Sequence, residues 1–577
     1  MPDPLLVLRT ARGLRWQQWA YRPLRRLQAR LGAPLPPVSA ATDASRAAAM
    51  RAAWEAVPGN VDERIARARG VLQGRFEFIG HAETLPRPAW TARPVSPLWT
   101  YNLHYFDYAV DLAWAWRRTG EAAFARAFER LAGGWMEETA GGRGPGWEPY
   151  TLSLRAVNWM RARLLFGDGV DAAFAARLDA SVHGQLAFLE RRLEWHILAN
   201  HLQKNLHALA LGGVYFATPQ AARWRTRGVA LLWRELREQV LDDGGHFERS
   251  PMYHAIALGD FLELLAMLDA CGLGVPAQAR ERVRRMAAAW ARLSRPTGQP
   301  QLFNDAAEGI APGGGELEAW ARLALGAAPV RPRGAWSLPE TGFCGWEGAD
   351  GRVVIDCGVP GPRYQPGHAH CDALSLELDI LGVRVLVNSG TSGYDGDPLR
   401  GYMRSTRAHS TVEIGGREQS EVWGTFRVGR MARVRATELP AEGADAFRFA
   451  GECVPYHDRR AAHLRVVERT GDGWRVDDRV RGAGGAPLRA FYHFDPAFEL
   501  RVEGATVTAV SPRVTVRARA WGADRVRVAR GETSPALGWQ ARRFGAAVPA
   551  PVLVLEIDHN DGRSFGCELS GRLDASG

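Results

Sequence analysis

Lysine is almost absent from this sequence, and so are the cysteine patterns of disulfide-bonded and zinc-binding modules. A single lysine, Lys204, stands among 73 basic residues, so arginine carries nearly all of the positive charge. The six cysteines are scattered without a CxxC pair, which argues against a disulfide framework and a zinc ribbon. The sequence also has no GxSxG elbow, P-loop, HExxH motif or convincing dinucleotide fingerprint. No organic cofactor is therefore predicted.

Long apolar runs and secretory features are missing as well. No stretch approaches the roughly 20 apolar residues of a membrane span, so no transmembrane segment is predicted. The apolar run Leu5–Leu8 is too short for the core of a signal peptide, and arginines follow it at once. Residues 1–45 are instead predicted to be a basic N-terminal helical segment, lying on a membrane surface or on the protein itself.

The charge balance favours an anionic partner. The formal net charge is +10, and arginine forks bind carboxylate and sulfate groups through two hydrogen bonds. An acidic polysaccharide fits this chemistry, and the 21 tryptophans could stack on sugar rings or fill helical cores. A codon bias toward arginine would explain the same excess. Nucleic acid is not predicted, because compact basic runs, RNP-like motifs and zinc-finger spacings are missing.

The periodicity of apolar residues changes once along the 577 residues. Residues 46–325 repeat apolar positions every three or four residues between Gly- and Pro-rich breaks, which predicts a bundle or toroid of antiparallel helices. Residues 326–340 are rich in Pro and Gly and are predicted to be a linker. Residues 341–577 show strand-like alternation rich in Val and Thr, which predicts an antiparallel β-sandwich. The fold class is thus α+β with two domains.

Two polar clusters interrupt the helical half. In 195–213 five polar groups interrupt a helix rich in Leu and Ala, which predicts a cleft wall, with ordinary solvent-facing residues as the alternative: Asn200, His201, Lys204, Asn205 and His207. The segment DDGGHFERSPMYH (242–254) is predicted to be a loop that leads into a helix, with Tyr253 in its first turn. A tuned tyrosine can give a proton to a leaving oxygen, although a tyrosine in such a pattern is more often a packed aromatic residue.

The second half contains the histidine pattern GHAHCD (367–372). His368 and His370 are two residues apart and are predicted to face one side of an extended strand. Together with His409 they form a divalent-metal pattern, for which satisfied structural histidines are the alternative.

These motifs together resemble the heparinase II/III-like polysaccharide lyases, most closely members found beside capsule and exopolysaccharide genes. The matching segments occur in the expected order from about residue 75 to 500: 98–108, 147–159, 199–205, 242–254, 303–305, 367–378, 385–394, 402–416 and 492–496. The resemblance implies an incomplete (α/α) toroid followed by antiparallel β-sheets. It also implies β-elimination at a uronic acid, in which the carboxylate is neutralised, a base removes the C5 proton and an acid protonates the C4 oxygen.

The resemblance also implies roles for individual residues. Asn200 matches the carboxylate-binding asparagine, with His201 beside it and His368 opposite, and Tyr253 matches the catalytic tyrosine. Tyr394 and Tyr402 are both candidates for the second member of the catalytic pair. The matching segments further supply candidate substrate-binding residues: Tyr105, Trp147, Glu148, Lys204, His246, Arg249 and Arg404.

The metal pattern departs from the family at one position. His370 and His409 match two ligands of a single zinc-like ion, but Asn388 stands where the family has aspartate. Asparagine is a poorer zinc ligand, so weak binding is expected, with well under one zinc per chain, unless Asp372 substitutes.

Two other functions are compatible with the sequence. A glycoside hydrolase on the same toroid would use paired carboxylates from Asp242, Asp243, Glu248 and Asp305. A non-catalytic glycan-binding protein of exopolysaccharide assembly would bind without turnover. The family resemblance favours the periplasm or cell envelope, whereas the N-terminal sequence favours the cytoplasm, and both compartments stay open.

Overall fold

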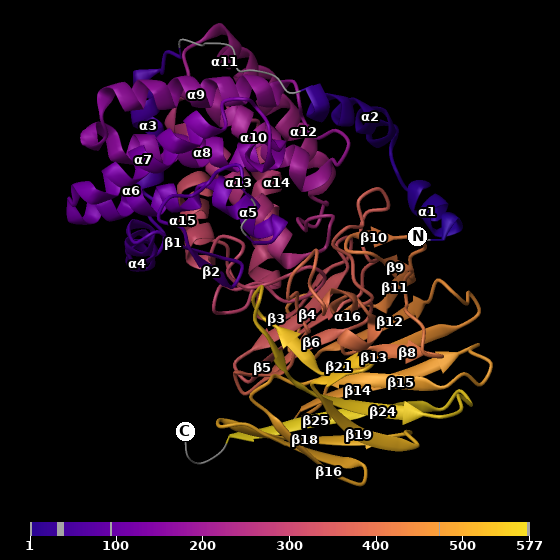
Figure 1. The fold of residues 1–577 in the computed structure, drawn as a ribbon. Coiled ribbons are helices and arrows are strands. Elements are labelled where there is room, and N and C mark those ends of the chain that lie inside the picture. The colour runs from indigo at the N-terminus through magenta and orange to yellow at the C-terminus, as the bar shows by residue number, and fades with distance from the viewer. Residues whose placement is uncertain (1–2, 32–39, 93–94, 472, 574–577) are drawn as a thin grey trace.

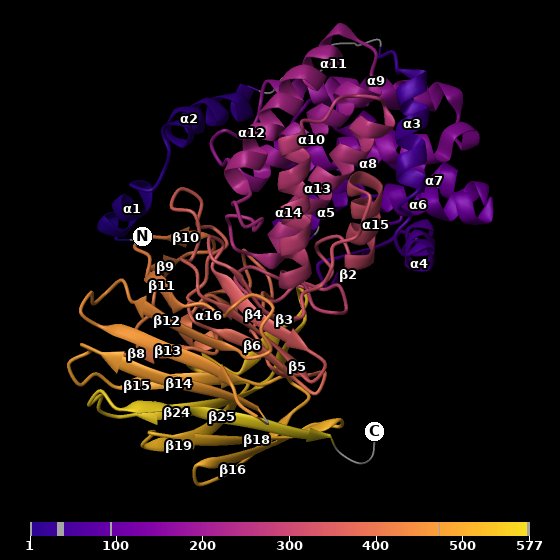
Figure 2. The same cartoon turned by 180° about the vertical axis from the view of Figure 1, so that it is seen from behind.

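The computed structural model describes residues 3–31, 40–92, 95–471 and 473–573. Helices fill the first part of the chain and antiparallel sheets fill the second, with one junction between them (Figure 1). This arrangement confirms the predicted fold class of a helical toroid followed by a sheet domain. Two further helices, α1 (Pro4–Ala11) and α2 (Trp16–Leu31), lie to one side, where the two parts meet (Figures 1 and 2).

The helical part is built from α3 to α15. The α-helices are α3 (Ala44–Glu55), α4 (Val61–Leu72), α5 (Pro97–Tyr105), α6 (Asp107–Thr119), α7 (Ala122–Glu138), α8 (Pro149–Phe166), α9 (Ala172–Glu190), α10 (Ala199–Tyr215), α11 (Pro219–Arg223), α12 (Val229–Gln239), α13 (Pro251–Ala270), α14 (Ala277–Leu293) and α15 (Gly314–Leu325). One hairpin, β1 (Arg75–Phe78) with β2 (His81–Thr84), interrupts the region predicted to be wholly helical.

Two helices run through the middle of the helical core. Most of α10 is buried, and α13 is buried along almost its whole length, so neither has the polar face of a surface helix. By length and composition alone α13 could cross a membrane, but 89% of its apolar window is buried inside the protein, as in a core helix. Both helices begin at the junction, and each carries candidate site residues in its first turn.

The second part contains three main antiparallel sheets. The five-stranded sheet has the order β3 (Gly334–Leu338), β4 (Phe343–Gly348), β5 (Gly351–Asp356), β6 (Leu376–Ile380) and β7 (Val383–Leu386). The eight-stranded sheet has the order β11 (Arg433–Glu438), β12 (Arg448–Val454), β13 (Ala462–Arg469), β14 (Gly473–Arg481), β25 (Ser564–Leu573), β18 (Val514–Trp521), β17 (Thr506–Val510) and β16 (Glu499–Glu503). The four-stranded sheet has the order β19 (Arg525–Arg530), β24 (Pro551–Ile557), β15 (Leu488–His493) and β8 (Val412–Ile414).

Alternating side chains assemble the sheet core as the sequence predicts. Along β13, β14 and β18 every second residue is buried, and the apolar ones among them form one core with the five-stranded sheet. The buried polar ones, His463, Arg465 and Asp478, contact one another instead. The segment predicted to be a linker, 326–340, contains β3, whose Trp336 is fully buried, so the ordered sheet begins earlier than predicted. The short helix α16 (Arg400–Met403) and the irregular segments 366–375 and 388–411 lie at the junction with the helices.

Candidate active site

His368 and His370 do not lie on a strand, contrary to the sequence prediction. Residues 366–375 form turns and bends before β6, and Pro366 and Gly367 are residue types that favour a turn. The two imidazoles nevertheless meet the same side chain: His368 Nδ1 lies 3.0 Å and His370 Nε2 lies 2.9 Å from the carboxylate of Asp305. Asp305, which lies in the loop between α14 and α15, thus contacts both histidines, which were expected to face one side of a strand.

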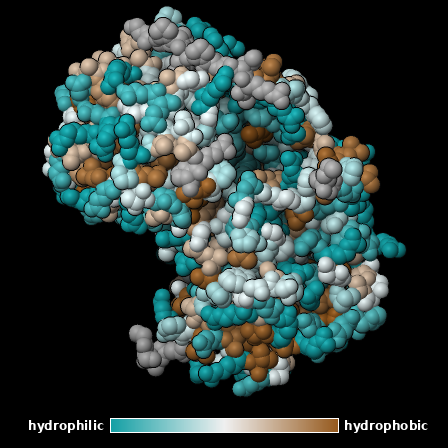
Figure 3. All heavy atoms as spheres, in the orientation of Figure 1, coloured by the Kyte–Doolittle hydropathy of each residue, from teal (hydrophilic) through white to brown (hydrophobic). Residues whose placement is uncertain are grey.

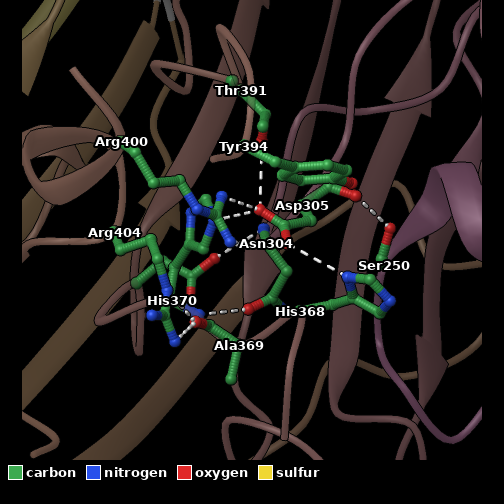
Figure 4. Close-up of polar contacts among 12 residues, drawn as sticks. Ser250, Asn304, Asp305, His368, Ala369, His370, Thr391, Tyr394, Arg400 and Arg404 are labelled. Carbon is green, nitrogen blue, oxygen red and sulfur yellow. Dashed lines mark hydrogen bonds and ion pairs between the residues drawn. The ribbon is translucent and has the colours of Figure 1, made fainter. Parts of the chain in front are cut away.

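Asp305 is the centre of this network (Figure 4). Its fully buried carboxylate accepts two hydrogen bonds from the Arg400 guanidinium, with 2.9 Å from Nη2 to Oδ2, and one from the Thr391 hydroxyl at 3.4 Å. Burial alone would raise the pKa of Asp305, but the charge of Arg400 and the two histidine contacts hold it well below its usual range. Asp305 is therefore a permanent anion that orients His368.

Tyr253 and Tyr394 form a hydroxyl pair beside His368. Tyr253 lies in the first turn of α13, where Ser250 caps the helix, and its hydroxyl oxygen is 2.9 Å from that of Tyr394. The Tyr253 ring stacks on the His368 ring with centroids 3.8 Å apart. Burial raises the pKa of both phenols, so two ionised oxygens at this separation are excluded. At least one hydroxyl of the pair always keeps its proton.

The first turn of α10 lies on the other side of the site from the tyrosine pair. Asn200 is buried, and within the described residues its Oδ1 has no hydrogen-bond partner. His201 Nδ1 lies 3.1 Å from Glu194 Oε1, and its ring packs against Tyr150, which in turn contacts Tyr105. Burial would lower the pKa of His201, but the adjacent Glu194 carboxylate outweighs burial and raises it. This turn thus presents a buried amide beside an imidazole that favours its cationic form.

Glu248 lies between His368 and the first turn of α10. Its buried Oε2 lies 3.3 Å from His368 Nε2. The backbone N–H of Asn200 also lies close enough to the carboxyl to lower its pKa. Burial raises the pKa of Glu248 above its usual value, against the pull of His368. Neither oxygen has a well-formed hydrogen bond within the described chain. Glu248 is therefore a carboxyl with spare hydrogen-bonding capacity at the centre of the site.

Backbone strain is concentrated at the same place. Ala199, Arg249 and Asn304 have φ values of 51°, 59° and 54°, a region that non-glycine residues rarely adopt. Each is adjacent in sequence to a site residue, namely Asn200, Glu248 or Asp305. Such conformations cost on the order of 1–3 kcal/mol each and cluster at functional sites. At Asn304 the side chain holds the strained turn, since Nδ2 donates to the Arg249 carbonyl and Oδ1 accepts from the His370 N–H.

Three predicted site residues have backbone groups as hydrogen-bond partners. Tyr402 lies in a separate apolar cluster, and its hydroxyl accepts from the backbone N–H of Gly538 at 3.1 Å. Trp147 is buried in the helical core, where its indole N–H donates to the Thr139 carbonyl. Arg404 is buried and donates to backbone carbonyls, including that of Ala369. Of the two candidate partners, it is therefore Tyr394 that contacts Tyr253.

The other predicted substrate-binding residues are held by protein partners. His246 is buried against Gln239, and Arg249 donates to the carbonyls of Glu340 and Thr341 in the turn before β4. Lys204 Nζ lies 2.6 Å from Asp260, and half-exposed Glu148 lies 3.4 Å from Arg25 of α2. Tyr105 contacts Tyr150, whose ring packs against His201.

A second group of buried ligands lies behind Asp305. His370, Asp372 and His409 offer ligand atoms within 4.8 Å of one another, and the two rings are 5.4 Å apart, as the sequence predicted for this pair. His370 Nδ1 and His409 Nε2 have no hydrogen-bond partner among the described residues, because the opposite ring nitrogens contact Asp305 and Asn388. Two ring nitrogens without partners beside a carboxylate fit a divalent cation. In this arrangement Asp372, and not Asn388, offers the third ligand atom. Asn388 instead contacts His409 Nδ1 and orients its ring.

Comparisons with known proteins agree with this architecture. A family profile described as "Heparinase II/III N-terminus" matches residues 70–311, and one described as "Heparinase II/III-like, C-terminal" matches residues 330–566. A solved structure titled "Crystal Structure of Heparinase III" has a TM-score of 0.70 over 97% of this chain and 90% of that chain, at 15% identity. This likeness shows the fold.

Two curated relatives match part of the chain. A "Heparin-sulfate lyase" of Pedobacter heparinus is 26% identical over 378 residues, which are 59% of this chain and 55% of the relative. An "FtsZ-localized protein C" of Caulobacter vibrioides is 26% identical over 338 residues, which are 57% of this chain and 54% of the relative. The chain therefore spans about half the length of the curated relatives it matches.

Proposed function

The chain belongs to the heparinase II/III-like family, and from this premise we propose that it is a polysaccharide lyase that cleaves an anionic, uronic-acid-containing glycan by β-elimination. The observation that carries the proposal is the Tyr253–Tyr394 hydroxyl pair, stacked on His368 and facing Asn200 across a buried carboxyl. A pair of phenols that shares protons can serve the two proton transfers that β-elimination requires.

β-Elimination has three requirements, and different residues meet each of them. The amide of Asn200 and the protonated form of Glu248 hydrogen-bond the uronate carboxylate, which makes the C5 proton more acidic. Tyr394, whose ring lies 5.1 Å from the Arg400 guanidinium, accepts the C5 proton as its phenolate, and the C5–H electron pair forms the C4–C5 double bond. The C4–O bond breaks with its electron pair, and Tyr253 donates its proton to the departing oxygen. No water is consumed.

The hydrolase alternative receives little support from the carboxylates that it requires. Asp242 pairs with Arg282, Asp243 accepts from the N–H groups of Glu340 and Thr341, and Asp305 is neutralised by Arg400. Glu248 is left without a second free carboxylate among these candidates, whereas glycoside hydrolysis uses two.

Purified protein incubated with a panel of acidic polysaccharides tests the proposal directly. We expect the ultraviolet absorbance of an unsaturated uronate to rise together with the number of new reducing ends. New reducing ends without that absorbance would indicate a hydrolase. Tight binding to a glycan without any turnover would indicate a binding protein.

Asn200→Ala is expected to lower turnover by about 10²–10³-fold, the usual effect of losing a hydrogen-bond donor to a developing oxyanion. The melting temperature should hardly change, because the Asn200 Oδ1 has no partner in the described chain. Asn60→Ala is the matched control. Asn60 caps α4 by accepting from the Glu63 N–H, so its loss should cost about 1 kcal/mol of stability and leave turnover intact. A large fall in melting temperature for Asn200→Ala would instead assign Asn200 to the structural network.

We also propose that His370, Asp372 and His409 hold a single divalent cation. When bound, it would tie segment 366–375 to the segment before β8 and so fix the histidine loop behind the catalytic groups. The weak affinity expected from the sequence assumed Asn388 as the third ligand, whereas Asp372 brings a carboxylate whose pKa burial raises to about 6. A cation beside it would favour its charged form.

Elemental analysis of purified protein tests this site independently of activity. We expect about one zinc-like ion per chain in the wild type and a loss of the ion in Asp372→Asn, with added metal no longer raising the melting temperature. Asn388→Ala should retain part of the metal, because Asn388 orients His409 without being a ligand. Wild-type protein that carries well under one ion per chain after growth with zinc would contradict the proposal and restore the sequence-based expectation.

A further inference from the structure

The helices α1 and α2 are attached to both parts of the protein through polar contacts. On α1, Arg9 pairs with Glu421 at 2.9 Å, and Thr10 accepts from the Trp423 indole at 3.0 Å. On α2, Gln18 is buried, and its amide donates to the Tyr364 carbonyl at 3.0 Å and to the carbonyl of Ile197, in the helical part, at 3.4 Å. These contacts position the two helices across the junction, so they form a strap with one face toward the protein (Figure 2).

The outer face of the strap is apolar, which reverses the usual pattern of a surface helix. In α2 the exposed residues Trp16, Trp19, Leu24 and Leu27 follow helical spacing, and Trp16 is 70% exposed. The inward-facing positions are mostly polar. On α1, Leu5, Val7 and Leu8 are exposed as well. Seven of the 16 large hydrophobic residues exposed in the described chain therefore lie between residues 5 and 27, and brown surface marks the position of α1 in Figure 3.

The strap is also strongly basic. Residues 1–31 contain seven arginines and one acidic residue, Asp3, in a chain whose formal net charge is +10. Arg12 and Arg26 are exposed beside the apolar stripe. Burial and the neighbouring charges of Arg427 and Arg26 lower the pKa of Arg22, which shows that cations crowd together here. Such a surface is complementary to a negatively charged one.

We propose that the strap lies flat on an anionic phospholipid bilayer, with its apolar stripe in the boundary between headgroups and acyl chains. Tryptophan, aliphatic side chains and flanking arginines are the composition of helices that bind at this depth. A sugar chain would stack on Trp16 and Trp19 but would leave Leu5, Leu8, Leu24 and Leu27 exposed to water. A second copy of this chain would bring two strongly positive straps together. The proposal does not depend on the lyase activity.

Vesicle flotation with the chain of 577 residues tests the proposal. The probes are vesicles of phosphatidylcholine alone and of phosphatidylcholine mixed with phosphatidylglycerol. We expect binding to the mixed vesicles that weakens with salt, together with a blue shift of tryptophan fluorescence. Leu24→Ser with Leu27→Ser should weaken binding by roughly tenfold per leucine. Arg12→Gln with Arg26→Gln should weaken it by about fivefold per arginine and reduce the preference for anionic vesicles.

The matched control removes two exposed apolar residues elsewhere, through Leu323→Ser with Val330→Ser, and should leave vesicle binding unchanged. All three double variants should keep the circular dichroism spectrum of the wild type, because the substituted side chains are exposed. The proposal is overturned if the wild type does not float with anionic vesicles, or if the leucine variant floats as well as the wild type. It is also overturned if the leucine variant changes only the oligomeric state or only glycan affinity, since the strap would then contact a second copy or a sugar chain.

Discussion

Tyr253→Phe should lower turnover by about 10²–10⁴-fold, the range that a general acid or base contributes, and should leave the fold intact. The substitution removes the hydroxyl that lies 2.9 Å from Tyr394 and keeps the ring that stacks on His368. The lost hydrogen bond is expected to cost about 1 kcal/mol of stability. Substrate affinity should change little, because the hydroxyl acts on the departing oxygen after binding.

Initial rates from the product absorbance, measured with melting temperature, separate this role from a structural one. Tyr394→Phe should cause a loss of similar size, and the double variant should be little worse than either single variant, since groups that act as a unit are not additive. Tyr215→Phe is the control, because its hydroxyl also loses a hydrogen bond, to Asp179, at the far end of α10. Its turnover should stay at the wild-type level. Tyr253→Phe turnover within a few-fold of the wild type would remove Tyr253 from the mechanism.

The order of the two structural halves could be predicted from the sequence because it depends on local periodicity. Apolar residues at helical spacing precede α15, and alternating residues follow it, so the change of period marks the change of structure. The β1–β2 hairpin was missed because each strand has only four residues. The order of the strands within each sheet could not be predicted, for another reason. Partners such as β14 and β25 are about ninety residues apart, and strand pairing over that distance leaves no local signal.

The sequence motifs singled out residues that the structure brings together, but the motifs did not give the contacts among them. Motifs identified Asn200, His201, Tyr253, His368 and Tyr394, all of which lie at the junction. The role of Arg400 was missed because nothing in the sequence distinguishes it from the many other arginines, and its role follows from its contact with Asp305. Asp305 lies in the matching segment 303–305, but the only role that the sequence suggested for it was that of a hydrolase carboxylate.

Burial places three of the predicted site residues away from the Tyr253–Tyr394 pair. Trp147, Arg404 and Tyr402 have side chains suited to sugar or proton chemistry, and the motifs around them are genuine. Each side chain instead forms a hydrogen bond with a backbone group, and such partners are not visible in a sequence. The metal pattern left two residues open for the third ligand, Asn388 and Asp372. The turn after His370 brings Asp372 toward His409, and a turn of this kind is not visible in the spacing of the residues.

Asp305→Asn should cost about 3–5 kcal/mol of stability, the usual effect of removing one partner from a buried ion pair. The variant leaves the Arg400 charge buried and weakens the contacts to His368 and His370. Because Arg400 holds the pKa of Asp305 below that of the unfolded chain, the stabilisation is present above about pH 4 and is lost as pH falls further. Turnover should also fall, since His368 loses the group that orients its ring under Tyr253.

Asp478→Asn provides a matched comparison that separates stability from catalysis. Asp478 is a fully buried carboxylate in β14 that accepts from Arg465 at 2.8 and 2.9 Å and contacts His463 at 2.7 Å, so its environment repeats that of Asp305 away from the site. Urea titrations should show similar losses of stability for the two variants. Rates measured well below both unfolding midpoints should fall for Asp305→Asn and stay near wild type for Asp478→Asn. Equal rates in the two variants would mean that Asp305 only supports the fold and that His368 needs no carboxylate to hold its position beneath Tyr253.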